Sequence, residues 1–312
     1  MSDDRRSGEE GALDVVIVGG GPAGLSAGLI LGRCRRRVLI CDDGRPRNAA
    51  SQALHGFLTR DGIAPAELRR IGREQLPGYD TVAIRDAEVV DAVREGTRFA
   101  ITTRDGTTLF SRKLLLATGV IDRLPKVPGF EPLYGRSAFH CPYCDGWEVR
   151  DSPLAVYAPG RRGFGLALEL KVWSRDVVLC TDGPSGLEPD ERRRLSRLTI
   201  PVREERVARF EGKDGQLTRV VFEEGPPLER SALFFNVGER QASGLALKLG
   251  CEFTEKGAVA TGKHERTNIP GLYVAGDASR SVQLAIVAAG EGAEAAFAIN
   301  TALIAEDLAE LL

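Results

Sequence analysis

The 312-residue sequence predicts an α/β fold, because short apolar runs alternate with helical segments along most of its length. The first observation is the apolar run Val15–Val18, which passes through a glycine-rich turn into an apolar helical segment, Leu25–Leu31. The second is that the same order of strand, turn and helix starts again at Leu154. The sequence therefore predicts two units of the same kind, each built on a parallel sheet.

The turn after the first strand is Gly19-Gly20-Gly21-Pro22-Ala23-Gly24, a G-x-G-x-x-G pattern. Gly19 permits the sharp turn, Gly21 lets the backbone approach a pyrophosphate, and Gly24 lets helix and strand pack closely, while the helix N-terminus attracts phosphate charge. A second strand, Val38–Cys41, ends at Asp42, about 20 residues downstream, where an acid binds a ribose hydroxyl. These features predict adenine-dinucleotide binding; a glycine-rich turn of some other α/β domain is the alternative.

The chain is expected to form two Rossmann-like, three-layer ββα domains, the second inserted in the first. Residues 13–120 and 242–312 are assigned to the first domain, residues 121–241 to the second, and residues 1–12 to a disordered tail. The remaining elements predicted for the first domain are a helix at Pro65–Leu76, short strands within 82–93, strands at Arg98–Thr103 and Lys113–Ala117, a strand leading into Gly276-Asp277, and a helix from about Val282 to Leu303. Those of the second domain are a strand at Leu154–Tyr157, a helix at Phe164–Trp173 and a strand at Val177–Cys180.

Composition and charge exclude several classes of partner. A formal net charge of −2 provides no general field for nucleic acid or an anionic membrane. A local basic run, interpreted as a solvated helix end, is formed by Arg33, Arg35, Arg36 and Arg37. No stretch approaches the roughly 18 consecutive apolar residues of a membrane span, and Met1–Gly11 lacks the apolar core of a signal peptide. We therefore expect a cytoplasmic protein without nucleic-acid or membrane partners.

Two of the six cysteines are close in sequence, in Cys141-Pro142-Tyr143-Cys144-Asp145-Gly146. Such a pair can cycle between dithiol and disulfide, and a carboxylate within hydrogen-bond reach can accept a thiol proton and return it. A surface C-x-x-C without chemistry is the alternative. The other cysteines are interpreted as buried thiols: Cys34, Cys41, Cys180 and Cys251. No metal is expected, because there is no second close cysteine pair and no histidine at ligand spacing.

Four motifs, in this order, resemble those of the low-molecular-weight thioredoxin reductases and their relatives among the class II pyridine nucleotide-disulfide oxidoreductases. They are Gly19-Gly20-Gly21-Pro22-Ala23-Gly24, Leu116-Ala117-Thr118-Gly119, Cys141-Pro142-Tyr143-Cys144-Asp145-Gly146 and Gly271-Leu272-Tyr273-Val274-Ala275-Gly276-Asp277. The resemblance covers nearly the whole chain. It implies that the first domain binds FAD and that the second, NAD(P)-binding-like domain carries the redox-active cysteines.

The resemblance also implies roles for individual residues. Cys144 would contact the flavin, Cys141 would exchange with substrate, and Asp145 would move the proton. Asp277 would lie near the ribityl-phosphate region of FAD, and Gln283, at the start of the last helix, beside the isoalloxazine. The full set of residues expected to bind FAD is Gly19, Gly21, Pro22, Ala23, Gly24, Asp42, Ala117, Thr118, Gly119, Gly276, Asp277 and Gln283.

The second nucleotide site departs from the pattern of that family. Reductases of this group show G-x-G-x-x-A where this chain has Ala158-Pro159-Gly160-Arg161-Arg162-Gly163, and a His-Arg-Arg cluster for the extra phosphate of NADPH where it has Thr181-Asp182-Gly183. Like charges 4 Å apart cost about 1 kcal/mol in water and about 4 kcal/mol near a protein surface. We therefore expect NADPH use to be lost. Asp182 could still suit the ribose diol of NADH, with Arg161 and Arg162 at a pyrophosphate.

Three hypotheses for function follow. The first is an FAD-dependent thiol/disulfide oxidoreductase, similar to the branch of dithiol oxidases and orphan reductases, which passes electrons between a small dithiol or disulfide and oxygen, a ferredoxin-like protein or NADH. The second is an NAD(P)H-dependent reductase of a thioredoxin-like protein, and the third is a non-enzymatic redox sensor. A homodimer is expected from the resemblance alone. His55 is a candidate base near flavin or substrate, with a structural role as the alternative.

Overall fold

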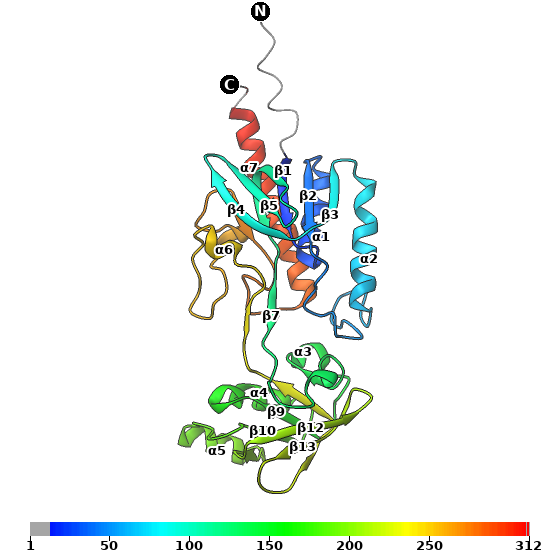
Figure 1. Cartoon of the computed structure of the whole chain (residues 1–312), viewed down its shortest axis with the longest axis vertical. Coiled ribbons are helices and arrows are strands. Elements are labelled where there is room, and N and C mark those ends of the chain that lie inside the picture. Colours follow the sequence, from blue (N-terminus) through cyan, green and yellow to red (C-terminus); the bar gives the residue numbers. More distant parts are fainter. Residues whose placement is uncertain (1–12, 310, 312) are drawn as a thin grey trace, which may run out of the picture.

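A computed structural model of the chain describes residues 13–309 and residue 311. The tail expected at residues 1–12 lies outside the described residues. Figure 1 shows two lobes stacked along the long axis, with α3 (Pro142–Asp145) at the end of the lower lobe that faces the upper one. Among the helices of the described residues, none is both long and apolar enough to cross a membrane.

The upper lobe is built on a seven-stranded sheet with the order β3-β2-β1-β6-β5-β4, in which β17 also pairs with β6. The strands are β1 (Leu13–Val18), β2 (Val38–Asp42), β3 (Val82–Asp86), β4 (Val89–Glu95), β5 (Arg98–Thr103), β6 (Thr108–Leu116) and β17 (Leu272–Val274). β1, β2, β3, β6 and β17 run parallel, whereas β4 and β5 extend the sheet antiparallel. The predicted α/β class is confirmed.

The parallel part of this sheet is buried on both faces, which explains the unbroken apolar run of the first strand. Val15 and Ile17 pack on one face against α1 (Pro22–Arg33) and α7 (Ala285–Ala309). Val16 and Val18 point to the other face, where β4, β5 and α6 (Leu245–Lys248) cover them. The predicted three layers are therefore present. The helix predicted at 65–76 is observed as α2 (Pro65–Gln75).

The lower lobe repeats this plan on a parallel sheet with the order β11-β10-β9-β15-β8. Its strands are β8 (Ala138–Phe139), β9 (Leu154–Tyr157), β10 (Val177–Cys180), β11 (Val202–Arg203) and β15 (Ala232–Phe235). One face packs against α4 (Gly163–Leu170) and α5 (Pro189–Arg197). The other packs against an antiparallel sheet of β12 (Val207–Lys213), β13 (Gln216–Phe222) and β14 (Leu228–Glu229).

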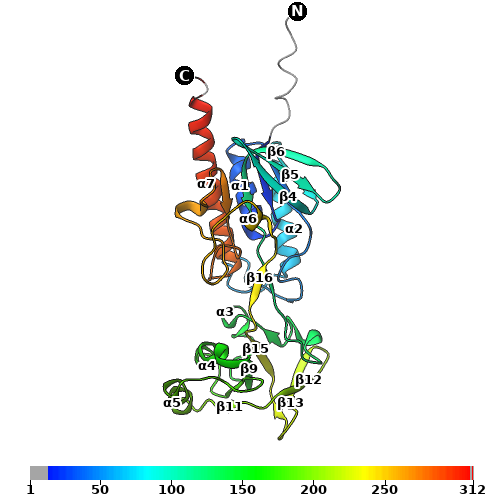
Figure 2. The same cartoon turned by 60° about the vertical axis from the view of Figure 1, so that its left-hand side comes forward.

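Two short strands carry the chain between the lobes. β7 (Val120–Asp122) leads into the lower lobe and β16 (Glu239–Gln241) leads out of it, and they pair antiparallel with Asp122 opposite Glu239. Figure 2 shows β16 on this connection. The lower lobe is thus inserted in the upper one. The exact domain boundaries at 120/121 and 241/242 stay a proposal.

Some details of the sequence interpretation were wrong. Cys34 is exposed, because it caps the C-terminus of α1 instead of lying in a core. The Arg36 side chain is not solvated: it is 13% exposed and donates hydrogen bonds to Asn300 and Asp307 of α7. Three helix ends also differ: α4 stops at Leu170, and α7 begins at Ala285, two residues after Gln283, and continues to Ala309.

Candidate functional site

Cys141 and Cys144 form a disulfide at the start of the one-turn helix α3. Cys141 is the N-cap, Pro142 occupies the first helical position, and the Sγ of Cys141 accepts a hydrogen bond from the backbone N–H of Cys144 at 3.1 Å. Both cysteines are partly exposed. The pair is therefore covalently linked, held at a helix start and open to solvent on one side.

Asp145, the next residue, has an unusual ionisation. Burial raises the pKa of Asp145 to about 7, the negative charge of Glu148 adds to the rise, and the charge of His55 opposes it. A carboxyl group with a pKa near 7 can both accept and donate a proton at neutral pH. Asp145 therefore has the properties expected of a group that exchanges protons with the neighbouring thiols.

The glycine turn after β1 is shaped as the sequence predicts. A Cβ on Gly19, which has φ +111°, would lie 2.2 Å from the carbonyl oxygen of Ala117, and a Cβ on Gly24 would lie 1.9 Å from that of Gly19. Neither position has room for a side chain. Around Gly21, the N-cap of α1, there is open space, with nothing within 4 Å of a Cβ. The turn thus leaves a free approach to the N-terminus of a twelve-residue helix.

Five of the other residues predicted to bind FAD lie in the first turn of α1 or directly after β6. Pro22 and Ala23 form the first turn of α1, and Ala117, Thr118 and Gly119 follow β6 directly. Gly276, after β17, donates its N–H to the Glu291 carboxylate, and a Cβ there would lie 3.2 Å from the Cβ of Ala23.

Asp42 ends β2 and already has several partners. One of its oxygens accepts hydrogen bonds from the backbone N–H of Gly20 and Gly44, and the other pairs with Arg69 and Arg73. A ribose contact at Asp42 stays a prediction.

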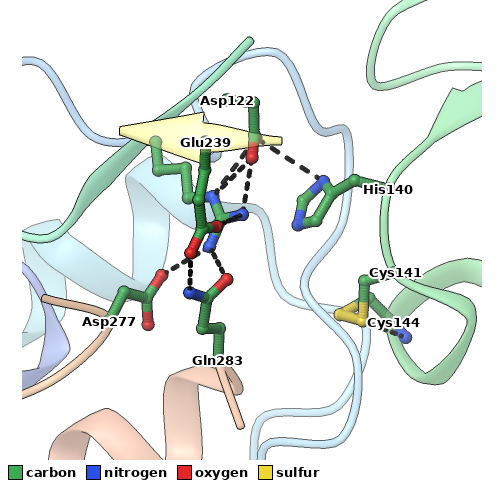
Figure 3. The surroundings of a disulfide bond; sticks show 8 residues. Asp122, His140, Cys141, Cys144, Glu239, Asp277 and Gln283 are labelled. Atoms are coloured by element: carbon green, nitrogen blue, oxygen red, sulfur yellow. Dashed lines mark hydrogen bonds and ion pairs between the residues drawn. A yellow bond between two sulfur atoms is a disulfide. The ribbon is translucent and has the colours of Figure 1, made fainter. Parts of the chain in front are cut away.

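A buried arginine that the sequence interpretation missed brings Asp277 and Gln283 together. The Arg47 guanidinium, 13% exposed, donates to Asp277 at 2.9 Å, to Gln283 at 2.5 Å and to Asp122 at 2.5 Å. It also pairs with Glu239 at 3.1 Å. Figure 3 shows the side chains of Asp122, Glu239, Asp277 and Gln283 pointing toward one another. These partners are 75 to 236 residues away in sequence, so no local pattern marks Arg47.

The network continues to the disulfide through Asp122. Its carboxylate accepts a hydrogen bond from the Tyr134 hydroxyl at 2.8 Å and lies 3.6 Å from Nδ1 of His140, the residue before Cys141. Burial would raise the pKa of Asp122, but the Arg47 hydrogen bond and the charge of His140 lower it below its usual value. Burial also lowers the pKa of His140. A continuous set of contacts therefore joins Gln283 to the backbone of the redox pair (Figure 3).

The turn after β9 has little in common with the one after β1. Ala158 is fully buried, and the segment Gly160–Arg162 is a 3-10 turn that runs directly into α4. Arg161 pairs with Glu191 at 2.9 Å, while Arg162 donates to the carbonyl oxygen of Val237.

After β10, Asp182 turns its carboxylate inward. One oxygen accepts the Tyr157 hydroxyl at 2.8 Å and the other accepts the backbone N–H of Val207 at 2.9 Å. Arg161, Arg162 and Asp182, the residues considered for NADH binding, thus already interact with other groups of the same chain. In the part of the chain that the structure describes, no group of three or more His, Cys, Asp or Glu side chains is arranged to hold a metal ion.

Comparison with known proteins agrees with this geometry. Residues 13–292 match the family described as pyridine nucleotide-disulphide oxidoreductase. Thioredoxin reductase tcpT of Claviceps purpurea is 32% identical over 85% of this chain and 86% of its own length. The crystal structure of HlmI is 40% identical with a TM-score of 0.92, covering 97% of this chain and 96% of that one. The crystal structure of the oxidoreductase from Agrobacterium tumefaciens is 32% identical with a TM-score of 0.87, covering 94% and 99%.

The chain belongs to the pyridine nucleotide-disulphide oxidoreductase family and is an oxidoreductase. Within that family it is thioredoxin reductase-like, in both sequence and fold. Members of this family are typically flavoproteins.

Proposed function

We propose that this protein is an FAD-dependent thiol/disulfide oxidoreductase in which the Cys141–Cys144 pair exchanges with a small dithiol or disulfide. The observation that carries the proposal is the contact chain through Arg47 and Asp122, which joins Gln283 of the expected flavin site to His140, the neighbour of Cys141. FAD, when bound, would accept two electrons from the dithiol and pass them to an acceptor.

The residues of the upper lobe fit FAD. The open space at Gly21 and the N–H groups at the start of α1 suit a pyrophosphate, and the contacts at Gly19 and Gly24 exclude side chains that would block its approach. Ala117, Thr118, Gly119, Gly276 and Asp277 follow the neighbouring parallel strands β6 and β17, so they lie at the same sheet edge. Ligands of such folds bind at this edge.

The lower lobe supports the loss of NADPH use. No arginine follows β10 at the position of the phosphate clamp, where Asp182 is already bound to Tyr157 and Val207. Arg161 would have to leave its ion pair with Glu191 to reach a pyrophosphate. We therefore propose that electrons leave to oxygen or a ferredoxin-like protein, with NADH as a weaker alternative.

Side chains beside the disulfide suit a small substrate. Tyr143 and Trp147 are 67% and 64% exposed on either side of Cys144, and aromatic faces of this kind bind apolar or ring-shaped molecules. By resemblance, Cys141 is the sulfur that exchanges with substrate and Cys144 the one nearer the flavin, and Asp145 carries the proton.

A cytoplasmic homodimer completes the proposal. Phe297, Ile304 and Leu308 of α7 are 63%, 45% and 55% exposed and recur at helical spacing, which gives α7 an apolar stripe for a second copy of the chain.

The first experiment mixes oxidised, FAD-loaded protein with NADPH and then with NADH in the absence of oxygen. We expect neither to bleach the flavin rapidly, whereas dithiothreitol does. Rapid bleaching by NADPH would contradict the proposed loss. In air, dithiothreitol should yield peroxide, and Cys144→Ser should abolish it. Cys34→Ser, which removes an exposed cysteine far from the disulfide in sequence, is the matched control and should keep full activity.

A second candidate function is an NAD(P)H-dependent reductase of a thioredoxin-like protein. It is favoured by the name thioredoxin reductase carried by tcpT. The same anaerobic experiment separates the two, because only this second function requires fast reduction by a pyridine nucleotide followed by transfer to thioredoxin.

A further inference from the structure

A loop of the upper lobe carries His55, which lies near the segment that follows α3 in the lower lobe. The loop closes on itself: the Leu54 N–H donates to the Ile63 carbonyl at 2.7 Å, and the Gly62 N–H donates to the Leu54 carbonyl at 2.9 Å. Leu54 is buried and anchors the loop. Figure 1 shows the loops at this end of the upper lobe facing α3.

The His55 ring lies between carboxylates from both lobes. Its Nε2 is 3.5 Å from Glu148, three residues after Asp145, and its Nδ1 is 3.6 Å from Asp61 of its own loop. Asp61 is held by the Gly56 N–H at 2.7 Å and is 72% exposed. The imidazole is 23% exposed, so most of its surface is covered by the protein. Asp61 and Glu148 lie within 4 Å of the imidazole, and Asp145 interacts with it electrostatically.

We infer that His55 is a positioning residue for proton transfer at the Cys141–Cys144 pair, which it serves by setting the charge state of Asp145 from across the lobe interface. The inference rests on the proposed function in that Asp145 serves thiol exchange there. A residue of the upper lobe thus takes part in the thiol chemistry of the lower lobe.

The exchange steps show why the charge state of Asp145 matters. A substrate thiolate attacks Sγ of Cys141, the Sγ–Sγ bond breaks, and Cys144 leaves as a thiolate that takes the proton of Asp145. The second substrate thiol gives its proton to the Asp145 carboxylate and attacks the mixed disulfide, releasing Cys141 as a thiolate. The substrate has lost two electrons to the enzyme pair, and Asp145 has given one proton and taken one. Asp145 must therefore change its protonation once in each direction.

Two neighbours act on Asp145 in opposite directions. The negative charge of Glu148 favours the protonated acid, and a positive charge on His55 favours the carboxylate. Without His55, Asp145 would stay protonated to higher pH and would give its proton to the Cys144 thiolate less readily at neutral pH. A histidine with a merely structural role would leave this balance unchanged.

The test follows the protonation of Asp145 directly. Infrared difference spectra of the full-length, FAD-loaded protein identify the Asp145 carboxylic acid band by its loss in Asp145→Asn. The wild-type midpoint is expected near pH 7. His55→Gln should raise the midpoint by about one pH unit, and Glu148→Gln should lower it by a similar amount. His55→Lys, which keeps a positive charge, should return the midpoint toward the wild-type value.

His264→Gln is the matched control, because His264 pairs with Glu294 of α7 at 2.8 Å. It should leave the midpoint unchanged. An unchanged or lowered midpoint in His55→Gln, or an equal rise in His264→Gln, would overturn the inference. A separate measurement, the trapping of new thiols with N-ethylmaleimide after dithiothreitol treatment, tests the proposed function: if the wild-type pair is not reduced, that function fails, while the titration still decides the role of His55.

Discussion

Replacing Arg47 with methionine should destabilise the protein more than any surface change, because it removes the positive charge that Asp122 and Asp277 share. Arg47 is 13% exposed, and its partners Asp122 and Asp277 are 5% and 21% exposed. Removing one partner of a buried ion pair costs about 3–5 kcal/mol. Unfolding entropy of about 2.1 cal/mol/K per residue gives roughly 0.7 kcal/mol/K for 312 residues. A loss of about 4 kcal/mol then lowers Tm by about 6 °C.

The loss should depend on pH in a defined direction. The pKa of Asp122 lies below its usual value of 3.8 in the folded protein, so this carboxylate contributes stability above pH 4, and that stability is lost as the pH falls through the folded pKa. In Arg47→Met, protonation of Asp122 removes the unpaired charge. The difference in Tm between wild type and variant should therefore be largest at pH 7 and become smaller below about pH 4.

The assay is thermal unfolding followed by circular dichroism at pH 7 and at pH 3.5, without added cofactor. Arg161→Met is the matched control, since Arg161 is 58% exposed and its pair with Glu191 lies at the surface. It should change Tm by no more than about 1–2 °C. Equal Tm values for wild type and Arg47→Met at pH 7, or a difference that does not vary with pH, would refute this account of the network.

Three further predictions concern other parts of the molecule. Gly24→Ala should reduce the yield of folded protein, because its Cβ would meet the Gly19 carbonyl, whereas Gly21→Ala should fold normally and bind FAD more weakly, as equilibrium dialysis would show. Asp145→Asn should become more stable relative to wild type as the pH rises from 4 to 8, because the folded pKa of Asp145 is raised from 3.8 to about 7. The gain in the free energy of unfolding, measured with urea, should reach about 4 kcal/mol. A difference in unfolding free energy that stays constant with pH would count against the raised pKa. Phe297→Glu should convert a dimer to a monomer in sedimentation equilibrium, and a dimer that survives would place the interface elsewhere.

Local features of the sequence were enough to predict much of the upper lobe. The run Val15–Val18 is apolar throughout because β1 is buried on both faces, and Gly24 is required by its contact with the Gly19 carbonyl oxygen in the same turn. The Cys141–Cys144 spacing likewise predicts a pair that a single helical turn can bring together. Features of this kind depend on neighbours a few residues away.

Features that depend on distant neighbours were missed or interpreted wrongly. Arg36 looked solvated because its partners, Asn300 and Asp307, lie on the last helix. The sequence did not indicate that Asp182, considered for a ribose, would also accept hydrogen bonds from Tyr157 and Val207. Charge and spacing along the chain do not reveal which opposite charge the fold will bring near, so such residues become visible only in three dimensions.

The antiparallel pairing of β7 with β16 has a practical consequence for dissecting this enzyme. Directly opposed residues of such strands lie about 5 Å apart, so the chain leaves and re-enters the upper lobe at nearly one point. A two-residue hairpin between Asp122 and Glu239 is therefore long enough to excise the lower lobe without stretching the backbone. The shortened protein would keep the glycine turn after β1 and lack both redox cysteines, so flavin affinity could be measured separately from thiol exchange.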